Sequence, residues 1–303
     1  MIAYRKETDI SSIRELCMQT HPQREEGFLK FYFAHLYEQG TGLIIKENER
    51  IISSLQLHEH VVAFHHKQLL CSYISGVSTH PDFRKQGHMN ELLHSALDMS
   101  ETNYLLTFIE AYNPKLYKKY GFEVVSYRKK YSVSQKEIKI KNTSGVQEEV
   151  DVADLVALYK DFSTRFDCYY KRDIVYYQDY MDSIEMNKGV LIGYYEESQL
   201  RGYCVYYESE ERVEVSEIIY LDAKVMLKLL RYAIGYMPFI SFEVSINERV
   251  EKIFKMSIPR KHTCVMARIN NYTLFNKLYS CKVKTVEEAF ALLQKPTLMN
   301  EKY

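Results

Sequence analysis

The stretch from Tyr73 to Leu97, YISGVSTHPDFRKQGHMNELLHSAL, constrains this chain more than any other. It predicts the end of a strand, a tight turn and then a helix. Pro81 has no backbone donor and closes the strand, and the helix follows Gly87. The helix is predicted by apolar residues at the spacing of one helical face, namely Met89, Leu92, Leu93, Ala96 and Leu97. A helix that starts over a strand end gathers unpaired N–H groups and the positive end of its dipole, so the stretch predicts an anion site.

Length and charge narrow the class of protein. The chain has 303 residues and 46% hydrophobic residues, enough for two domains with their own cores. Lysine plus arginine equals aspartate plus glutamate at 40 each, which argues against nucleic acid as the main partner. The densest basic stretch, Arg128–Lys141, is interpreted as a solvated linker, with a contact to an acidic ligand or partner as the alternative.

Cysteine spacing and hydropathy indicate the compartment. The six cysteines show no close pairs and no C-x-x-C, so neither a zinc site nor a disulfide framework is expected, and no metal is predicted. No stretch approaches the ~18 apolar residues of a spanning helix. We therefore expect a soluble, cytoplasmic protein with reduced thiols and no membrane partner.

The first half predicts an α+β arrangement with a mainly antiparallel sheet interrupted by helices. A helix capped by Thr8 or Asp9 comes first, and Asn113 and Pro114 start a short helix that Gly121 ends. The other expected elements are a helix over Gly27–Gln39, strands over Gly42–Lys46, Ile51–Leu57, Val61–Phe64, Leu69–Val77 and Tyr104–Ala111, and the last strands over Phe122–Val133.

The second half reads as a worn copy of the first. GVLIGYYEESQLRGYCVYY aligns with GLIIKENERIISSLQLHEH, and a strand over Val213–Leu221 runs straight into a helix over Asp222–Ile234. The copy thus keeps the scaffold and lacks the anion turn. The alternative is a chance likeness between two strand-rich regions. The tail predicts a strand over Cys264–Ile269, a helix over Tyr272–Leu278 and a capping box at Thr285, whereas the final PTLMNEKY has no evident structure.

The turn carries a resemblance to a known family. PDFRKQG is a relative of the R/Q-x-x-G-x-G/A signature, here Arg84 to Met89, in which the glycine allows close approach of a pyrophosphate. Together with GVSTHP before it and NPKLYKKYGF downstream, it resembles the GNAT (Gcn5-related N-acetyltransferase) superfamily. The chain is most similar to the enhanced-intracellular-survival (Eis) type, which joins two such domains to a small sterol-carrier-like domain. MARINNYTLF resembles the entry to that third domain, but too few residues follow Cys264 to complete it.

The resemblance implies tandem GNAT-like domains: a catalytic domain over 1–145, a degenerate one over 146–262 and a truncated third domain over 263–303. Acetyl-CoA is the implied co-substrate. In the family the strand before the turn splays from its neighbour, and Gly76 suits a bulge that starts the splay. The backbones of Val77 and Thr79 would hold the thioester end, and the N–H groups from Lys85 to Asn90 the pyrophosphate. The implied cofactor-binding residues are Val77, Ser78, Thr79, Arg84, Lys85, Gln86, Gly87, His88, Met89, Asn90 and Asn113.

Two catalytic residues are implied by the same resemblance. Tyr117 would protonate the leaving thiolate, since a phenol with a pKa near ~10 is protonated at neutral pH; the alternative is that it only packs. Asn113 either bonds the pantetheine or caps its helix. The terminal carboxylate of Tyr303 would act as base, with a frayed terminus as the alternative and Glu110 as the second candidate.

The implied activity is acetyl-CoA-dependent transfer of an acetyl group to a primary amine of a small, polyamine-like or aminoglycoside-like molecule. His58, Glu59 and His60 would line the acceptor cleft or form a wet strand face. One alternative is a non-catalytic acetyl-CoA-binding or assembly module, and a homo-oligomer is among the expected forms. The other alternative is acetylation of a protein lysine.

Overall fold

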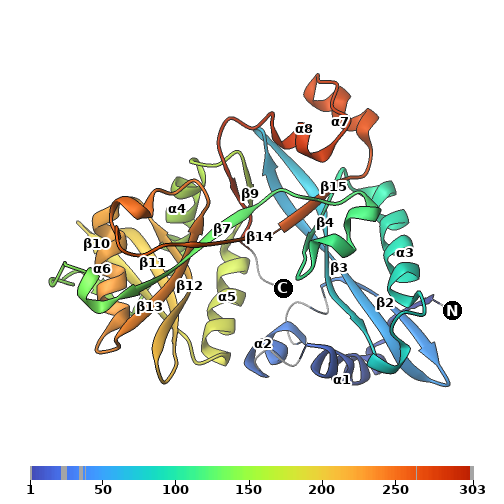
Figure 1. The fold of residues 1–303 in the computed structure, drawn as a ribbon, viewed down its shortest axis with the longest axis horizontal. Coiled ribbons are helices and arrows are strands. Elements are labelled where there is room, and N and C mark those ends of the chain that lie inside the picture. Colours follow the sequence, from blue (N-terminus) through green and yellow to red (C-terminus); the bar gives the residue numbers. More distant parts are fainter. Residues whose placement is uncertain (1, 22–25, 34–36, 38, 264, 301–303) are drawn as a thin grey trace.

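The computed structural model describes residues 2–21, 26–33, 37, 39–263 and 265–300. Two sheets lie side by side, each flanked by helices (Figure 1). The first sheet has the path β1-β2-β3-β4-β5-β15-β6, with β9 and β16 joined beside β3, and the second has the order β14-β7-β13-β12-β11-β10-β8. Most neighbouring strands are antiparallel, which confirms the α+β class with two mainly antiparallel sheets.

The first sheet is covered on both faces. Apolar residues of α3 such as Leu92 pack on one face, and residues of α1 and α2 such as Leu16 and Leu29 pack on the other. Its elements are β1 (Ile2–Tyr4), α1 (Ile10–Thr20), α2 (Glu26–Phe31), β2 (Thr41–Glu47), β3 (Arg50–Phe64), β4 (Lys67–Thr79), α3 (His88–Asn103), β5 (Leu106–Glu110) and β6 (Glu123–Val124). The predicted break between Leu57 and Val61 is wrong, because the β3–β4 ladder continues through 58–60 whatever the polarity of the side chains.

The second half repeats the topology of the first. Both hairpins turn through two residues with positive φ, Asn48 and Glu49 in one and Glu197 and Ser198 in the other. As β4 lies parallel to β5, so β12 lies parallel to β13. This shared topology supports the duplication. The elements are β8 (Val146–Gln147), α4 (Val152–Ser163), β9 (Cys168–Tyr170), α5 (Ile174–Met186), β10 (Val190–Glu196), β11 (Gln199–Glu208), β12 (Arg212–Tyr220), α6 (Ala223–Ile234), β13 (Phe239–Ser245) and β14 (Arg260–Thr263).

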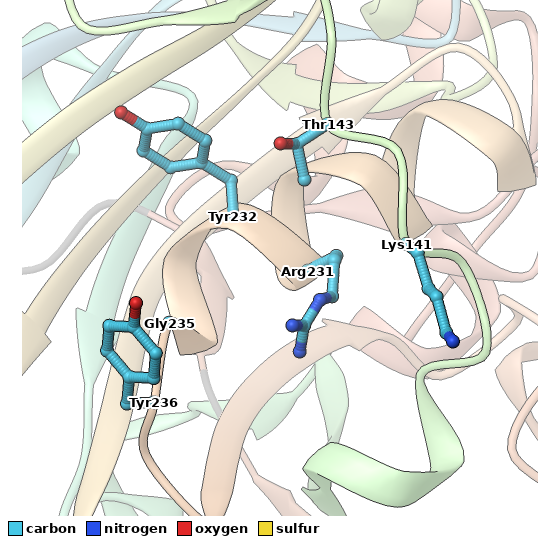
Figure 2. A pocket seen from close by; sticks show the side chains of 6 residues that line it. All are labelled: Lys141, Thr143, Arg231, Tyr232, Gly235 and Tyr236. Carbon is cyan, nitrogen blue, oxygen red and sulfur yellow. The ribbon is translucent and has the colours of Figure 1, made fainter.

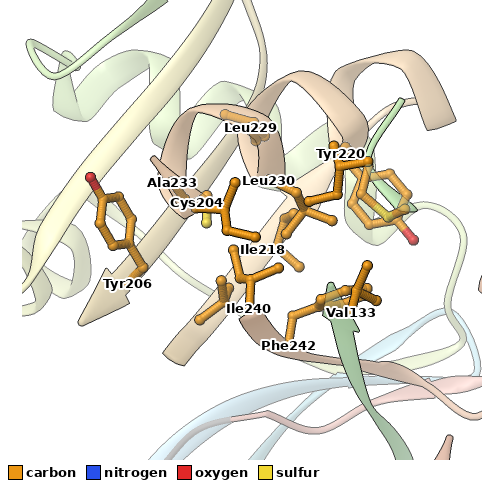
Figure 3. Close-up of a cluster of buried hydrophobic side chains, with 14 of the residues drawn as sticks. Val133, Cys204, Tyr206, Ile218, Tyr220, Leu229, Leu230, Ala233, Ile240 and Phe242 are labelled. Atoms are coloured by element: carbon orange, nitrogen blue, oxygen red, sulfur yellow. The ribbon is translucent and has the colours of Figure 1, made fainter. Parts of the chain in front are cut away.

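The two halves exchange strands. β7 (Tyr127–Ser134) pairs with β13 and β14 of the second sheet, while β15 (Val265–Ile269) pairs with β5 and β6 of the first. Val133 of β7 lies with Ile240 and Phe242 in the core of the second half (Figure 3). The prediction that this segment supplies the last strands of the first half is therefore wrong for β7. An alternating apolar strand fits either sheet, and its pattern does not say which.

The tail completes the first sheet instead of forming a layer of its own. After β15, α7 (Tyr272–Tyr279) and α8 (Val286–Phe290) pack against that sheet through Phe275 and Val286. The expectation of no structure after Pro296 is wrong for β16 (Thr297–Leu298), which pairs in parallel with β9, itself paired with the end of β3. The last described residues thus lie between the two halves.

A buried ion pair lies at the junction between the two halves. The Arg172 guanidinium makes two bonds to the Glu217 carboxylate, at 2.8 and 3.0 Å, and stacks against the ring of Tyr159. Tyr203 Oη and Asn300 Nδ2 donate to the same carboxylate at 2.6 and 2.5 Å. Although burial alone would raise the pKa of Glu217, Arg172 and the hydrogen bond from Tyr203 hold it below its usual value. Asn300 is thereby fixed to the second half close to the chain end.

Candidate functional site

The pairing of β4 with β5 ends partway along β4. Their ladder runs only from Ser72 to Ile74 on β4, although β4 continues to Thr79. Gly76 has a φ of +59°, and the register of β4 against β3 shifts at the same place. This is a bulge, which bends the strand that carries it. It confirms the bulge expected at Gly76. Beyond Ile74, its last residue paired with β5, β4 continues to Thr79, and we call this end of the β4–β5 pairing the splay.

The turn after β4 presents backbone donors to open space. Lys85 has a φ of +63°, and Gly87 has a φ of +95° as the N-cap of α3. A Cβ placed on Gly87 would have no heavy atom within 4 Å, so a ligand can approach this backbone closely. The unpaired N–H groups of the first turn of α3 face the same region. The local geometry fits a phosphate-bearing ligand.

Several predicted binding residues are already engaged in the turn. Arg84 Nε donates to the carbonyl of Thr79 at 3.2 Å, and Gln86 Nε2 donates to the carbonyl of Asp82 at 3.2 Å. The Ser78 hydroxyl points to α1, where it accepts a bond from Thr20 Oγ1 at 3.0 Å. Only the backbone of Ser78 is therefore available to the splay.

Two cations near the turn were missed by sequence reasoning. Arg50, at the start of β3, lies with Nη2 2.6 Å from Nε2 of His80. Lys119 Nζ and Tyr120 Oη both donate to Asn90 Oδ1, at 3.1 and 2.8 Å. These contacts bring the 118–120 segment against the start of α3. In the sequence, only the two lysines of YKKYG hinted at positive charge near the turn. A sequence pattern does not show which element a segment packs against.

Tyr117 is buried in the apolar core of the first half. It is 8% exposed and belongs to the apolar cluster that contains Ile74 and Ile109, the last paired residues of β4 and β5. Burial, with a smaller contribution from Tyr120, raises the pKa of Tyr117 to about 12. The phenol therefore keeps its proton at neutral pH.

The segment around Tyr117 consists of two 3-10 turns, Pro114–Leu116 and Lys118–Tyr120, and not the expected short helix. Asn113 Oδ1 accepts a bond from the N–H of Lys115 at 3.2 Å, which confirms the capping interpretation. A bond from Asn113 to pantetheine stays a prediction.

The residues proposed for the acceptor side separate onto two faces of β3. His58 is buried, and burial together with His60 lowers its pKa to about 3; burial lowers the pKa of His60 to about 4. Both rings are therefore neutral at pH 7. Glu59 is exposed and accepts a bond from the Tyr104 hydroxyl. The wet-face alternative is thus wrong for His58 and fits Glu59.

Of the two candidates for the catalytic base, the structure describes only Glu110. Glu110 is exposed at the end of β5, in register with Val265 of β15. Tyr303 lies outside the described residues, so its role stays a prediction.

In the second half, a side chain occupies the place that corresponds to the end of the β4–β5 pairing. There β12 and β13 pair only over Arg212–Glu214, and β12 continues to Tyr220 before Asp222 caps α6. The carboxylate of Glu248 accepts bonds from the N–H of Ser245, at 3.0 Å, and from the Tyr220 hydroxyl. The second half thus lacks the glycine turn and closes its splay with a carboxylate.

A separate hollow of about 280 Å³ lies at the end of α6 (Figure 2). It is lined by Lys141, Thr143, Arg231, Tyr232, Gly235 and Tyr236. It belongs to the second half and includes no residue of β4, β5 or α3. We therefore assign no acceptor to it.

Comparison with known proteins identifies the first part of the chain. Residues 2–125 match the family model described as "Acetyltransferase (GNAT) domain". The first half of the chain is a GNAT acetyltransferase domain. A search of curated proteins found no match. Among the described residues, no group of three or more His, Cys, Asp or Glu side chains is placed to hold a metal ion, and no helix is long and apolar enough to cross a membrane.

Solved structures share the fold of the GNAT domain together with the second half. A probable N-acyltransferase from Enterococcus faecalis V583 has a TM-score of 0.77 at 15% identity, over 91% of this chain and 74% of that one. A GCN5-related N-acetyltransferase from Kribbella flavida has a TM-score of 0.71 at 13% identity, over 89% and 70%. Eis1 from Mycobacterium abscessus has a TM-score of 0.67 at 10% identity, over 89% and 74%.

Proposed function

We propose that this GNAT protein transfers the acetyl group of acetyl-CoA to a primary amine of a small, polyamine-like or aminoglycoside-like molecule. One observation carries the proposal: a single strand, β4, carries both the bulge at Gly76 that opens the splay and the turn that leads to the open backbone at Gly87. An acyl-CoA needs both, because its pyrophosphate and its thioester are far apart.

The residues of the splay and turn fit the two ends of this co-substrate. The N–H groups from Lys85 to Asn90 would hold the pyrophosphate, with Lys119 adding positive charge beside Asn90. The backbones of Val77 and Thr79 would pair with the pantetheine arm. Arg84 would exchange its contact with the Thr79 carbonyl for the ligand.

Tyr117 would supply the proton that the departing sulfur needs. Burial in the apolar cluster that also contains Ile74 and Ile109 raises its pKa, which keeps the phenol protonated at neutral pH. The acceptor amine must lose a proton, for which the Tyr303 carboxylate or Glu110 is the proposed base.

The second half would serve as scaffold. The proposal gives catalysis to the domain predicted over 1–145 and treats 146–262 as a degenerate copy, which the Glu248 carboxylate in its splay supports. We place the protein in a reducing, cytoplasmic setting, which is the proposed reason that the described cysteines form no disulfide with one another.

Thiol release from acetyl-CoA over a panel of polyamines, aminoglycosides and lysine peptides tests the proposal. We expect release that depends on a small amine. Calorimetric binding of acetyl-CoA without turnover on any amine would contradict it and favour a binding module. The same panel with residues 301–303 deleted tests the base: unchanged turnover would remove Tyr303 from the mechanism.

A further inference from the structure

The hollow at the end of α6 has two positively charged side chains on its walls (Figure 2). Arg231 lies in the last turn of α6, and Lys141 lies in the segment between β7 and β8. Figure 2 shows the guanidinium of Arg231 between the ring of Tyr236 and the ammonium group of Lys141. The basic stretch Arg128–Lys141, for which an acidic ligand or partner is the alternative interpretation, thus ends at this hollow.

The two charges at the hollow are available to a group from outside the chain. Lys129, near the start of the basic stretch, is paired within the protein, with Nζ 3.3 Å from a carboxylate oxygen of Glu251. In the described part of the chain, by contrast, neither Lys141 nor Arg231 makes an ion pair or a side-chain hydrogen bond.

The hollow favours an anion over a cation. Residues 138–147 and 223–242, which contribute its walls, contain no aspartate or glutamate. Glu148 follows the first of these segments and accepts a bond from the Tyr232 hydroxyl at 3.1 Å, and Figure 2 shows this hydroxyl turned away from both cations. The C-terminal end of α6 adds about half a negative charge, which two full positive charges exceed.

Hydrogen bonds hold the two walls of the hollow together. Gln135 Nε2 donates to the carbonyl of Gly235 at 2.7 Å, and Lys228 Nζ donates to the carbonyl of Ser144 at 2.6 Å. Both bonds join the segment after β7 to α6 or to the residue that ends it. The hollow is therefore already formed before a ligand binds, which lowers the cost of ordering it.

Size and exposure favour a protein segment over a free small molecule. The hollow has a volume of about 280 Å³, below the ~300–1,000 Å³ of pockets that enclose a small-molecule ligand. Lys141 is exposed at its edge, and the side chain of Tyr236 is fully exposed. Tyrosine and arginine are among the residue types that contribute most to binding at protein interfaces.

We propose that this hollow docks an acidic segment of a partner protein. A glutamate or aspartate carboxylate of that segment pairs with Arg231 and Lys141, and a neighbouring side chain packs on the ring of Tyr236. The planar guanidinium suits this role, because its parallel N–H groups match the two oxygens of a carboxylate. The inference does not depend on the proposed acetyl transfer, and it gives the second half a role in recruiting a partner.

The test measures binding of a fluorescently labelled hexaglutamate peptide by anisotropy at low salt, where screening of exposed charges is weak. We expect saturable binding to the wild type and a Kd about 10-fold higher for Arg231→Gln, because the charge-assisted pair is lost. Lys136→Gln is the matched control: Lys136 is exposed in the same basic stretch but does not line the hollow, and its variant should stay within about 2-fold.

Tyr236→Ala gives a second variant that does not depend on the folding of Arg231→Gln. Its ring is fully exposed, so the substitution leaves the core intact, and we expect the Kd to rise about 3-fold. Absence of saturable binding would overturn the inference. Equal Kd values for wild type and Arg231→Gln, or equal losses in Arg231→Gln and Lys136→Gln, would do the same.

Two further measurements identify other occupants. Displacement of the peptide by inorganic phosphate at matched ionic strength would assign the hollow to a phosphorylated ligand and overturn the proposal. The exposed acidic turn Glu208–Glu211 makes a second copy of this chain another candidate. Sedimentation velocity tests it: self-association of the wild type that Arg231→Gln abolishes would assign the hollow to that second copy, whereas equal sedimentation of both supports a separate acidic partner.

Discussion

At the scale of single residues, the proposed acetyl transfer depends most on Tyr117. Burial in the cluster around Ile74 raises its pKa to about 12, so its phenol is held as a donor. We predict that Tyr117→Phe lowers kcat about 100-fold, the usual size of a general-acid contribution, and leaves the Kd of acetyl-CoA within about 2-fold. Steady-state kinetics and calorimetry on the same preparation measure both. Equal kcat in variant and wild type would remove Tyr117 from the mechanism.

His58 and His60 also make a prediction at this scale, for stability. Their pKa values in the folded protein, about 3 and about 4, lie below the ordinary ~6.5 of the unfolded chain. Their stabilising contribution is therefore complete above pH 6.5 and is lost as the pH falls from 6.5 toward 4. Each group should cost about 1.4 kcal/mol per pH unit in that window.

Urea unfolding at pH 7.5 and pH 5.0 checks this dependence. His60→Phe keeps a ring against Tyr73 and Tyr170, with which His60 makes edge contacts, and removes one titrating group. The variant should therefore lose less stability between the two pH values than the wild type does. An unchanged pH dependence would show that His60 does not contribute.

At the scale of elements, the Glu217 carboxylate of β12 binds both Arg172 and Asn300, which follows β16. Glu217→Gln leaves the buried Arg172 guanidinium without its counter-charge, so we predict a loss of about 3–5 kcal/mol in the free energy of unfolding. Glu214→Gln, on the same strand, is the matched control: its exposed carboxylate lies 3.2 Å from Lys130, and the loss should stay below about 1 kcal/mol. Equal losses would show that burial of the pair does not matter.

The elements also show which features of the fold could be predicted from the sequence. The stretch around Gly87 predicted its own strand, turn and helix, because a proline, a glycine and a helical stripe are local signals. The bulge at Gly76 was also predictable, since positive φ favours glycine. The contact of Arg50 with His80 gave no signal, because it arises only when the start of β3 and the end of β4 fold against each other. The alternation of apolar and polar residues in β7 did not indicate which of the two sheets this strand would join.

At the scale of the whole molecule, the two halves are one structure with one predicted acetyl-CoA site. Each sheet borrows a strand across the junction, β7 for the second and β15 for the first, so neither half has a complete sheet without the other. Only the first half combines an open splay with the glycine turn; in the second, Glu248 bonds to Tyr220 at the corresponding place. The architecture therefore predicts one acetyl-CoA per chain.

Calorimetric titration with acetyl-CoA tests this central claim most directly. We predict one site per chain, which Gly87→Ala weakens by at least about 10-fold, because a Cβ strains a φ of +95° and intrudes on the open backbone. Gly235→Ala is the control: Gly235 also has a positive φ and open space around it, but it ends α6 in the second half, and its variant should bind like the wild type. Two sites per chain, or equal binding by Gly87→Ala and wild type, would contradict the account.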